Sequence, residues 1–478
     1  MLRVLFVSSE GVPFVKTGGL ADVVGSLSKA LFDKGIDIRV IMPLYGTISL
    51  ELKSKMIYKR NIYVRLGWRN QYCGIFECKL DGVIFYFIDN EYYFKREKIY
   101  GFFDEAERYA FFCKAVLESL PYTGFEPDVI HCHDWQTGLI PVFLEAYCRC
   151  REYYKNVRTL FTIHNLKYQG IFPKTILNEL LNLSDDYFTP DKLEFNGCVN
   201  FMKGGIIYSN LLTTVSPTYS KEIQTEYYGE KLDGVLKARS SDLFGILNGI
   251  DYDEYDPETD KLIFQNYSIG HIEKKTENKI KLQNELGLDV SPNIPIIAMI
   301  SRLTPQKGID IIISMLDEIV SCGLELVILG TGEREYEESF TSAKDKYPSR
   351  VSSNIKFDET LAHNIYAGAD LFLMPSCFEP CGLGQMIALR YGTLPIVRET
   401  GGLKDTVISY NEFTMQGNGF SFTNYNGHDM VYTIKRALNF YNDKKVWNSI
   451  IANAMLCNFS WNASADKYIK LYEKLIGF

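Results

Sequence analysis

The sequence predicts an α/β protein with two domains, each built around a doubly wound parallel sheet. Short apolar runs typical of buried strands alternate with segments of helical spacing. The alternation stops at an acidic segment near residue 251 and resumes near residue 296, and 478 residues suffice for about three average domains or two large ones. Hydrophobic residues make up 46% and charged residues 23%, which excludes disordered, collagen-like and coiled-coil proteins.

The first β-α-β unit follows from the N-terminal pattern. Residues 2–7 form an apolar run, and apolar residues then recur at helical spacing over 20–31. Gly35 is placed to end that helix, and residues 36–42 predict the next strand, parallel to the first. Further strands of this domain are predicted at 83–88, 128–133, 159–163 and 211–215.

A change of composition near Gly249 predicts the domain boundary. Residues 251–260 hold six acids in ten positions, and a polar, lysine-rich stretch follows to about Asn284. We therefore expect a first domain over 1–247, a second over 248–456 and a terminal helix over 457–478. In the second domain we expect strands at 296–301, 324–329, 369–374 and 394–397, with a helix beginning at Gly308. The terminal helix has one apolar face, formed by Trp461, Ala465, Tyr468, Tyr472, Leu475 and Ile476.

Charge and cysteine usage exclude several classes of protein. Lys plus Arg is 51 and Asp plus Glu is 59, a net charge of −8, opposite in sign to that of a non-specific nucleic-acid binder. No uncharged apolar stretch approaches the ~20 residues that cross a bilayer, and the N-terminus has no signal-peptide pattern. Eleven scattered cysteines fit a reducing compartment. We expect a cytoplasmic protein that binds neither nucleic acid nor membrane.

The segment K-T-G-G-L at residues 16–20 lies at a strand-to-helix junction. Free backbone N–H groups and the helix dipole favour an anion there, and phosphate is the natural ligand. A tight turn with a surface lysine fits the same residues equally well. No glycine is followed by lysine and no G-x-G-x-x-G follows a strand, so P-loop hydrolysis and nicotinamide chemistry are disfavoured.

Two loops of the second half carry charged residues just after predicted strands. Arg302 and Lys307, in S-R-L-T-P-Q-K-G, can clamp a diphosphate, although a solvated basic loop is the alternative. Glu379, in P-S-C-F-E-P-C-G-L-G-Q, can bind sugar hydroxyls or stabilise positive charge on a reacting carbon, although it can also cap a helix. The carboxyl edge of the sheet is where α/β proteins bind ligands.

Two histidine segments also follow strands. Strand alternation points His131 and His133 to one face, which suggests metal ligands, but no third ligand is visible and we interpret His131 as a core residue. Asp134 and His164, each just past an apolar strand, are better candidates for lining a cleft. No cysteine pair has the spacing of a zinc site.

Together these segments resemble the bacterial glycogen synthases and plant starch synthases. Seven motifs match the family pattern in order: K-T-G-G-L-A-D-V, H-D-W-Q-T-G-L, T-I-H-N-L-K-Y-Q-G, T-V-S-P-T-Y, I-L-N-G-I-D, S-R-L-T-P-Q-K-G and P-S-C-F-E-P-C-G-L-G-Q. The resemblance implies two Rossmann-like domains facing a central cleft, the GT-B type of glycosyltransferase fold, with a terminal helix that returns to the first domain. It also implies transfer of glucose from ADP-glucose to the non-reducing end of glycogen or another α-1,4-glucan, with retention and without metal or other cofactor.

The resemblance further implies a role for each matching residue. The first domain would hold the glucan acceptor and the second the nucleotide sugar. The catalytic residues would be Asp134, His164, Arg302, Lys307 and Glu379. The donor-binding residues would be Lys16, Gly18, Gly19, Asn248, Phe357, Cys381, Gly382 and Leu383.

Within this set, the cations would bind the phosphates and the polar residues the glucose. Arg302 and Lys307 would neutralise the departing ADP, and Lys16 would assist them with the Gly18 and Gly19 backbone. His164 and Asn248 would contact the transferred glucose, with Asp134 beside the reacting centre and Glu379 near the 3-hydroxyl. The backbone N–H groups of residues 381–383 would reach sugar and phosphate, and Phe357 would lie under the adenine.

The chain also departs from the family pattern. Gly384 stands where the family usually has threonine, and Asn196 where an aromatic residue or histidine is usual. Two alternatives remain: a UDP-glucose-dependent glucan synthase and a non-catalytic glucan-binding protein that kept the fold.

Overall fold

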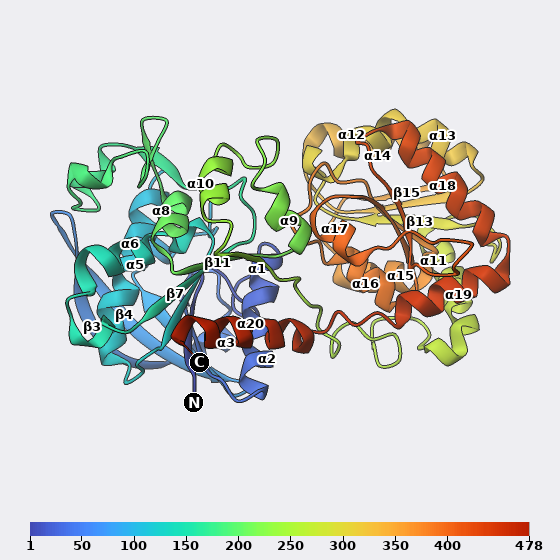
Figure 1. Ribbon diagram of the computed structural model, residues 1–478. Coiled ribbons are helices and arrows are strands. Elements are labelled where there is room, and N and C mark those ends of the chain that lie inside the picture. Colours follow the sequence, from blue (N-terminus) through green and yellow to red (C-terminus); the bar gives the residue numbers. More distant parts are fainter. Residues whose placement is uncertain (478) are drawn as a thin grey trace. The chain divides into compact units, whose positions relative to one another are not determined.

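The computed structural model describes residues 1–477 and divides into two compact α/β units. Unit 1 consists of Met1–Gly249 and the chain from Trp461 onward, and unit 2 of Ile250–Ser460. In each unit helices pack around a central sheet (Figure 1). No helix among residues 1–477 is both long and apolar enough to span a bilayer.

Unit 1 contains a nine-stranded sheet in the order β12-β11-β7-β6-β1-β2-β5-β4-β3. The seven strands from β12 to β5 are parallel, so their carboxyl ends share one edge. The six strands predicted for this domain are all confirmed. The strands of this sheet are β1 (Arg3–Val7), β2 (Asp37–Pro43), β3 (Ile57–Leu66), β4 (Arg69–Leu80), β5 (Val83–Asp89), β6 (Val129–His133), β7 (Arg158–Ile163), β11 (Leu211–Thr214) and β12 (Leu243–Gly245).

The antiparallel strands β3 and β4 and the short β12 were not predicted from the pattern. Most of β3 is exposed, so it lacks the continuous apolar run that marks the buried parallel strands. The sheet is therefore parallel at its centre and antiparallel at one edge.

The helix predicted over 20–31 is present as a continuous helical run. It consists of α1 (Gly19–Asp22), the π-helical turn η1 (Val23–Leu27) and α2 (Ser28–Asp33). Gly35 follows with φ +85°, a left-handed conformation that favours glycine, which confirms its place at the helix end. The other helices of unit 1 are α3 (Leu50–Ser54), α4 (Glu91–Phe94), α5 (Glu105–Ser119), α6 (Leu139–Phe143), α7 (Ile176–Glu179), α8 (Phe201–Tyr208), α9 (Pro217–Glu222) and α10 (Asp233–Ala238).

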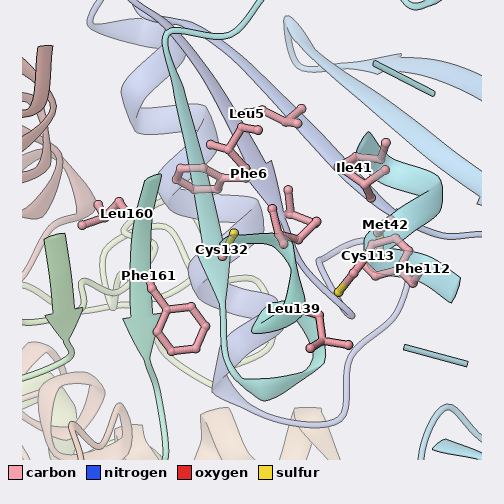
Figure 2. Packing of buried hydrophobic residues seen from close by; sticks show 14 of the residues in the cluster. Leu5, Phe6, Ile41, Met42, Phe112, Cys113, Cys132, Leu139, Leu160 and Phe161 are labelled. Carbon is pink, nitrogen blue, oxygen red and sulfur yellow. The ribbon is translucent and has the colours of Figure 1, made fainter. Parts of the chain in front are cut away.

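The core of unit 1 lies between the parallel strands and their helices. Side chains of β1, β2, β6 and β7 interlock with those of α5 and α6 (Figure 2). All ten residues labelled there are buried: Leu5, Phe6, Ile41, Met42, Phe112, Cys113, Cys132, Leu139, Leu160 and Phe161. This packing holds the strand ends, and thus the loops that follow them, in fixed positions.

The terminal helix α20 (Trp461–Ile476) packs within unit 1, beside α2 and β6 (dark red in Figure 1). The Tyr472 hydroxyl lies 2.8 Å from Nδ1 of His131, and the Ser464 hydroxyl donates to the carbonyl of Leu247 at 2.6 Å. The face of α20 that was predicted to be apolar is buried, as the positions of Trp461 and Tyr468 show.

Unit 2 contains a six-stranded, fully parallel sheet in the order β15-β14-β13-β16-β17-β18. The four strands predicted here are confirmed, while β15 and β18 were not foreseen. The strands are β13 (Ile296–Ile300), β14 (Glu325–Leu329), β15 (Val351–Asn354), β16 (Leu371–Met374), β17 (Leu394–Arg398) and β18 (Phe420–Phe422). The helices are α11 (Lys275–Leu286), α12 (Ile309–Ser314), α13 (Leu316–Ser321), α14 (Arg334–Lys346), α15 (Glu359–Gly368), α16 (Gly384–Arg390), α17 (Gly401–Thr406), α18 (Gly427–Tyr441) and α19 (Lys444–Met455).

Asn196 forms part of a tight hairpin turn. A small sheet joins β8 (Ile171–Pro173), β10 (Cys198–Asn200) and β9 (Glu194–Phe195) in that order. Asn196 and Gly197, with φ of +51° and +78°, link the antiparallel strands β9 and β10. Asn-Gly is the sequence that two-residue hairpin turns with two positive φ values prefer, which explains asparagine at this position.

Candidate active site

In unit 1 the candidate residues all follow carboxyl ends of parallel strands. Residues 16–19 follow β1, Asp134 follows β6, His164 follows β7 and Asn248 follows β12. Strands β1, β6 and β7 are neighbours in the sheet, so the loops after them emerge side by side.

Asp134 and His164 are brought together. Asp134 has φ +59°, a strained conformation for a residue other than glycine, and its Oδ1 accepts the backbone N–H of His164 at 2.7 Å. Burial raises the pKa of Asp134 to about 7, although backbone hydrogen bonds from His164 and Asn165 act against this, and the nearby charge of Glu10 adds to the rise. This carboxyl group therefore changes its charge near neutral pH.

The three histidines of unit 1 lie next to one another with their rings tilted. Burial lowers the pKa of His164 to about 3, so its ring is neutral at physiological pH, and its Nε2 lies 3.0 Å from Nδ1 of His133. The rings of His131 and His133 lie 4.2 Å apart, which confirms that both point to one face. His131 is fully buried between Tyr472 and Thr162, which confirms its interpretation as a core residue.

The loop that carries Lys16 is held by a residue that sequence reasoning missed. The buried carboxylate of Glu10 accepts the backbone N–H of Thr17 at 2.6 Å, the Thr17 hydroxyl at 3.0 Å and the Tyr100 hydroxyl at 3.0 Å. Lys16 itself is half-exposed and pairs with Asp22 at 2.7 Å. The anchored loop leaves the lysine accessible at the start of α1. A lone glutamate directly after the first strand was the only signal for this contact.

Replacing Glu10 by glutamine is expected to raise the KM for the nucleotide sugar roughly tenfold and to destabilise unit 1 by about 2 kcal/mol. The glutamine amide nitrogen cannot accept the hydrogen bonds that the second carboxylate oxygen receives, so the loop loses a charge-assisted contact. Initial rates against donor concentration and thermal unfolding measure both effects. Glu97→Gln, at an exposed position of the same unit, is the control, and equal behaviour of the two variants would remove Glu10 from this role.

Asn248 has an unused acceptor. The side chain is 7% exposed, and its Oδ1 is buried without a hydrogen-bond partner among the described residues. Buried polar atoms are normally paired, so an amide oxygen left open in this way suits a ligand hydroxyl.

In unit 2 the structure pairs Lys307 with Glu379. Nζ of Lys307 donates to Oε2 of Glu379 at 2.5 Å, and the two side chains are only 15% and 7% exposed. The Ser376 hydroxyl donates to the same oxygen at 3.2 Å. Arg302, in the same loop as Lys307, is exposed and makes no ion pair with any residue that the structure describes, which leaves its guanidinium group open to an anion.

Gly308 lets the loops of Lys307 and Glu379 approach each other. It has φ +74°, and a Cβ placed there would lie 2.2 Å from the carbonyl oxygen of Pro375. Across the same contact, the backbone N–H of Cys377 donates to the carbonyl of Gln306 at 2.9 Å. Only glycine fits this backbone conformation and this distance together.

Gly308→Ala is therefore expected to destabilise unit 2 by at least about 2 kcal/mol more than Gly323→Ala does, because overpacking adds to the backbone strain. Gly323 has a similar φ of +78° but open space around its Cβ, so it isolates the conformational part of the effect. Thermal unfolding followed by circular dichroism compares the two variants. Equal thermal midpoints of the two variants would show that the close approach of Gly308 to Pro375 does not affect the stability of unit 2.

The loop of Glu379 rests on residues from two later segments. Nη1 of Arg398 donates to the carbonyl of Cys377 at 2.6 Å. A Cβ at Gly401 would lie 1.9 Å from the carbonyl oxygen of Glu379, and one at Gly402 would lie 2.2 Å from that of Cys381. The second T-G-G-L segment, at 400–403, thus packs tightly against this loop, whereas the Cβ position of Gly18 in the first T-G-G-L is open. The sequence analysis did not identify Arg398, although the repeated T-G-G-L motif lies just after it at residues 400–403.

The remaining donor-binding candidates follow β15 and β16. Gly382 has φ +75°, and Nε2 of Gln385 donates to the carbonyls of Cys381 and Gly382 at 3.0 Å, which fixes the turn that leads through Leu383 into α16. Phe357 is 89% exposed and makes no ring contact with any residue of 1–477, so its face is open to stacking. A Cβ at Gly384 would lie 3.0 Å from the Phe372 ring, a tight fit at this position.

Comparison with known proteins agrees with this fold and these loops. Residues 3–238 match the family described as starch synthase catalytic domain, and residues 283–454 match glycosyl transferases group 1. The chain is 56% identical to a glycogen synthase of Desulforamulus reducens over 99% of both chains. It is 57% identical to a glycogen synthase of Geobacillus thermodenitrificans over 99% of this chain and 98% of the relative.

Solved structures show the same architecture. The catalytic domain of starch synthase IV from Arabidopsis thaliana, bound to ADP and acarbose, superposes with a TM-score of 0.93 at 34% identity over 100% of both chains. A sucrose-phosphate synthase of Thermosynechococcus elongatus, at 17% identity and a TM-score of 0.63, shares the fold. The two α/β units and their loops define a glycosyltransferase of the GT-B type. Within that class, the chain belongs to the glycogen synthase family.

Proposed function

We propose that this chain transfers glucose from ADP-glucose to the non-reducing end of an α-1,4-glucan such as glycogen, with retention of configuration. The observation that carries the proposal is the match along 99% of the chain to glycogen synthases at 56% and 57% identity. ADP in the starch synthase IV structure supports an adenine nucleotide as the donor's leaving group. Unit 1 would provide the acceptor side, and unit 2 the nucleotide-sugar side.

The charged groups suit the charges that develop during this reaction. Departure of ADP builds negative charge on a phosphate oxygen, and Arg302 and Lys307 would stabilise that charge, with Lys16 assisting from unit 1. Positive charge grows at the anomeric carbon, and the carboxylate of Asp134 would stabilise it. His164 would act through hydrogen bonds in its neutral form, because burial lowers its pKa to about 3.

Retention is proposed to follow from attack on the same face that ADP leaves. The glycosidic C–O bond to the phosphate breaks, the acceptor 4-hydroxyl oxygen forms the new bond to the anomeric carbon, and its proton moves to the departing phosphate oxygen. No motif supplies two carboxylates flanking the bond, as a double-displacement glycosidase would require. The step needs neither a metal ion nor another cofactor.

The donor-binding roles complete the proposal. Glu379, held by Lys307, would bind the glucose near its 3-hydroxyl, and Asn248 would use its open Oδ1 on the same sugar. Phe357 would stack under the adenine. Backbone N–H groups would bind phosphate or sugar at Gly18, Gly19, Cys381, Gly382 and Leu383. Eleven free cysteines support a cytoplasmic location.

The test is incorporation of labelled glucose into glycogen from ADP-glucose and, in parallel, from UDP-glucose, with EDTA present and Glu379→Ala as the control. We expect rapid incorporation from ADP-glucose that the variant loses. Incorporation from UDP-glucose alone would overturn the donor. Glycogen binding without incorporation from either donor would overturn catalysis in favour of a glucan-binding protein.

A further inference from the structure

A group of metal-ligand residues lies in unit 2, on α15 and the acidic segment 251–260. Ligand atoms of Glu254, Glu359 and His363 all lie within 4.8 Å of one another. Glu359 and His363 are four residues apart on α15, so they occupy the same helix face. Glu254 comes from the acidic segment, which the proposed glucosyl transfer does not use.

The buried His363 is oriented by a carboxylate. Its side chain is 2% exposed, and its Nδ1 lies 2.7 Å from Oδ2 of Asp260, which also accepts the Tyr391 hydroxyl at 2.6 Å. An ionised carboxylate only accepts hydrogen bonds. With Nδ1–H donating to Oδ2 of Asp260, the imidazole offers its lone pair at Nε2.

No side chain or backbone group of residues 1–477 forms a hydrogen bond with Nε2 of His363, which is buried. The Tyr255 ring stacks on the imidazole at 4.9 Å with an interplanar angle of 18°, which fixes the ring plane. An oriented imidazole whose other nitrogen bonds a carboxylate is the arrangement that metal-binding histidines adopt.

We propose that Glu254, Glu359 and Nε2 of His363 bind a divalent first-row transition-metal cation, with Zn²⁺ as the representative ion. One imidazole and two carboxylates suit Zn²⁺, whereas Ca²⁺ and Mg²⁺ prefer sites made of oxygen ligands. Three protein ligands leave a fourth position for water. The ion would tie the acidic segment to α15 and stabilise unit 2, and it would take no part in glucosyl transfer.

The test uses the full chain after treatment with EDTA and removal of the chelator. Calorimetric titration with Zn²⁺ is expected to show one site, and Zn²⁺ at a hundredfold excess over its Kd is expected to raise the thermal midpoint by roughly 5 °C. Glu254→Gln and Glu359→Gln should each weaken Zn²⁺ binding at least about tenfold. Both glutamates are exposed, so these variants should fold, and the exposed Glu258→Gln in the same segment is the matched control.

Replacement of Zn²⁺ by Co²⁺ identifies the ligands. Weak d–d absorption without a thiolate charge-transfer band is expected for nitrogen and oxygen ligands. A charge-transfer band would assign the ion to a cysteine such as the exposed Cys150 and would overturn the proposal. So would equal Zn²⁺ affinity of the three variants, or tighter binding of Ca²⁺ than of Zn²⁺.

Discussion

Lys307→Ala is expected to lower the rate of glucose transfer by roughly two orders of magnitude, about 3 kcal/mol of lost transition-state stabilisation. The lysine lies in the loop after β13, and its ammonium group is held at 2.5 Å from the Glu379 carboxylate in a largely buried position. A cation fixed there needs little reorganisation when negative charge develops on the departing phosphate. Initial rates of labelled glucose incorporation at saturating donor measure the loss.

Lys307→Ala also leaves the Glu379 carboxylate without its cation. A second substitution separates this effect from the loss of charge stabilisation at the phosphate. Combining Lys307→Ala with Glu379→Gln removes the unpaired charge. If Lys307 acts on the phosphate, the double variant is at least as slow as the single one, because Glu379→Gln also weakens the contact with the glucose. Recovery of the rate in the double variant would show that the lysine only compensates Glu379. Lys346→Ala, at an exposed ion pair with Asp317 in the same unit, should keep the full rate.

The positions of the candidate residues along the fold could be predicted because they depend on local pattern. Each of Asp134, His164 and Arg302 follows an apolar run, and parallel strands bring the ends of such runs to one edge of a sheet. The pairing of Lys307 with Glu379 could not be predicted in the same way. It joins residues 72 positions apart and depends on Gly308, whose close contact with Pro375 only the folded chain shows.

The residues that sequence reasoning missed act through the backbone of other loops. Glu10 accepts a backbone N–H of Thr17, and Arg398 donates to the carbonyl of Cys377. Backbone groups are the same in every residue, so such contacts leave no complementary side chain to find in the sequence. The mostly exposed strand β3 was not predicted for a related reason, since polar residues interrupt its apolar pattern.

Asp134→Asn is expected to lower kcat/KM by roughly a hundredfold at pH 8 and to change the pH profile. Asparagine keeps an oxygen that can accept the N–H of His164, so the variant removes the charge and keeps the shape. In the parent chain the carboxyl group has a pKa of about 7. The rate should therefore rise with pH up to about 7 and then level, whereas the variant should lack this rise.

The free energy of unfolding should change with pH in the opposite direction to the rate, falling as the pH rises. The pKa of Asp134 in the folded chain lies above the ordinary carboxyl value of about 4, so the folded chain binds this proton more tightly than the unfolded chain. The stabilisation from Asp134 is thus present below about pH 4 and is lost as the pH rises through about 7, and Asp134→Asn should remove this slope from the thermal midpoint. Because the charge of Glu10 contributes to the raised pKa, Glu10→Gln should also shift the rate profile to lower pH. A profile that Asp134→Asn leaves unchanged would assign the titration to another group and remove Asp134 from charge stabilisation.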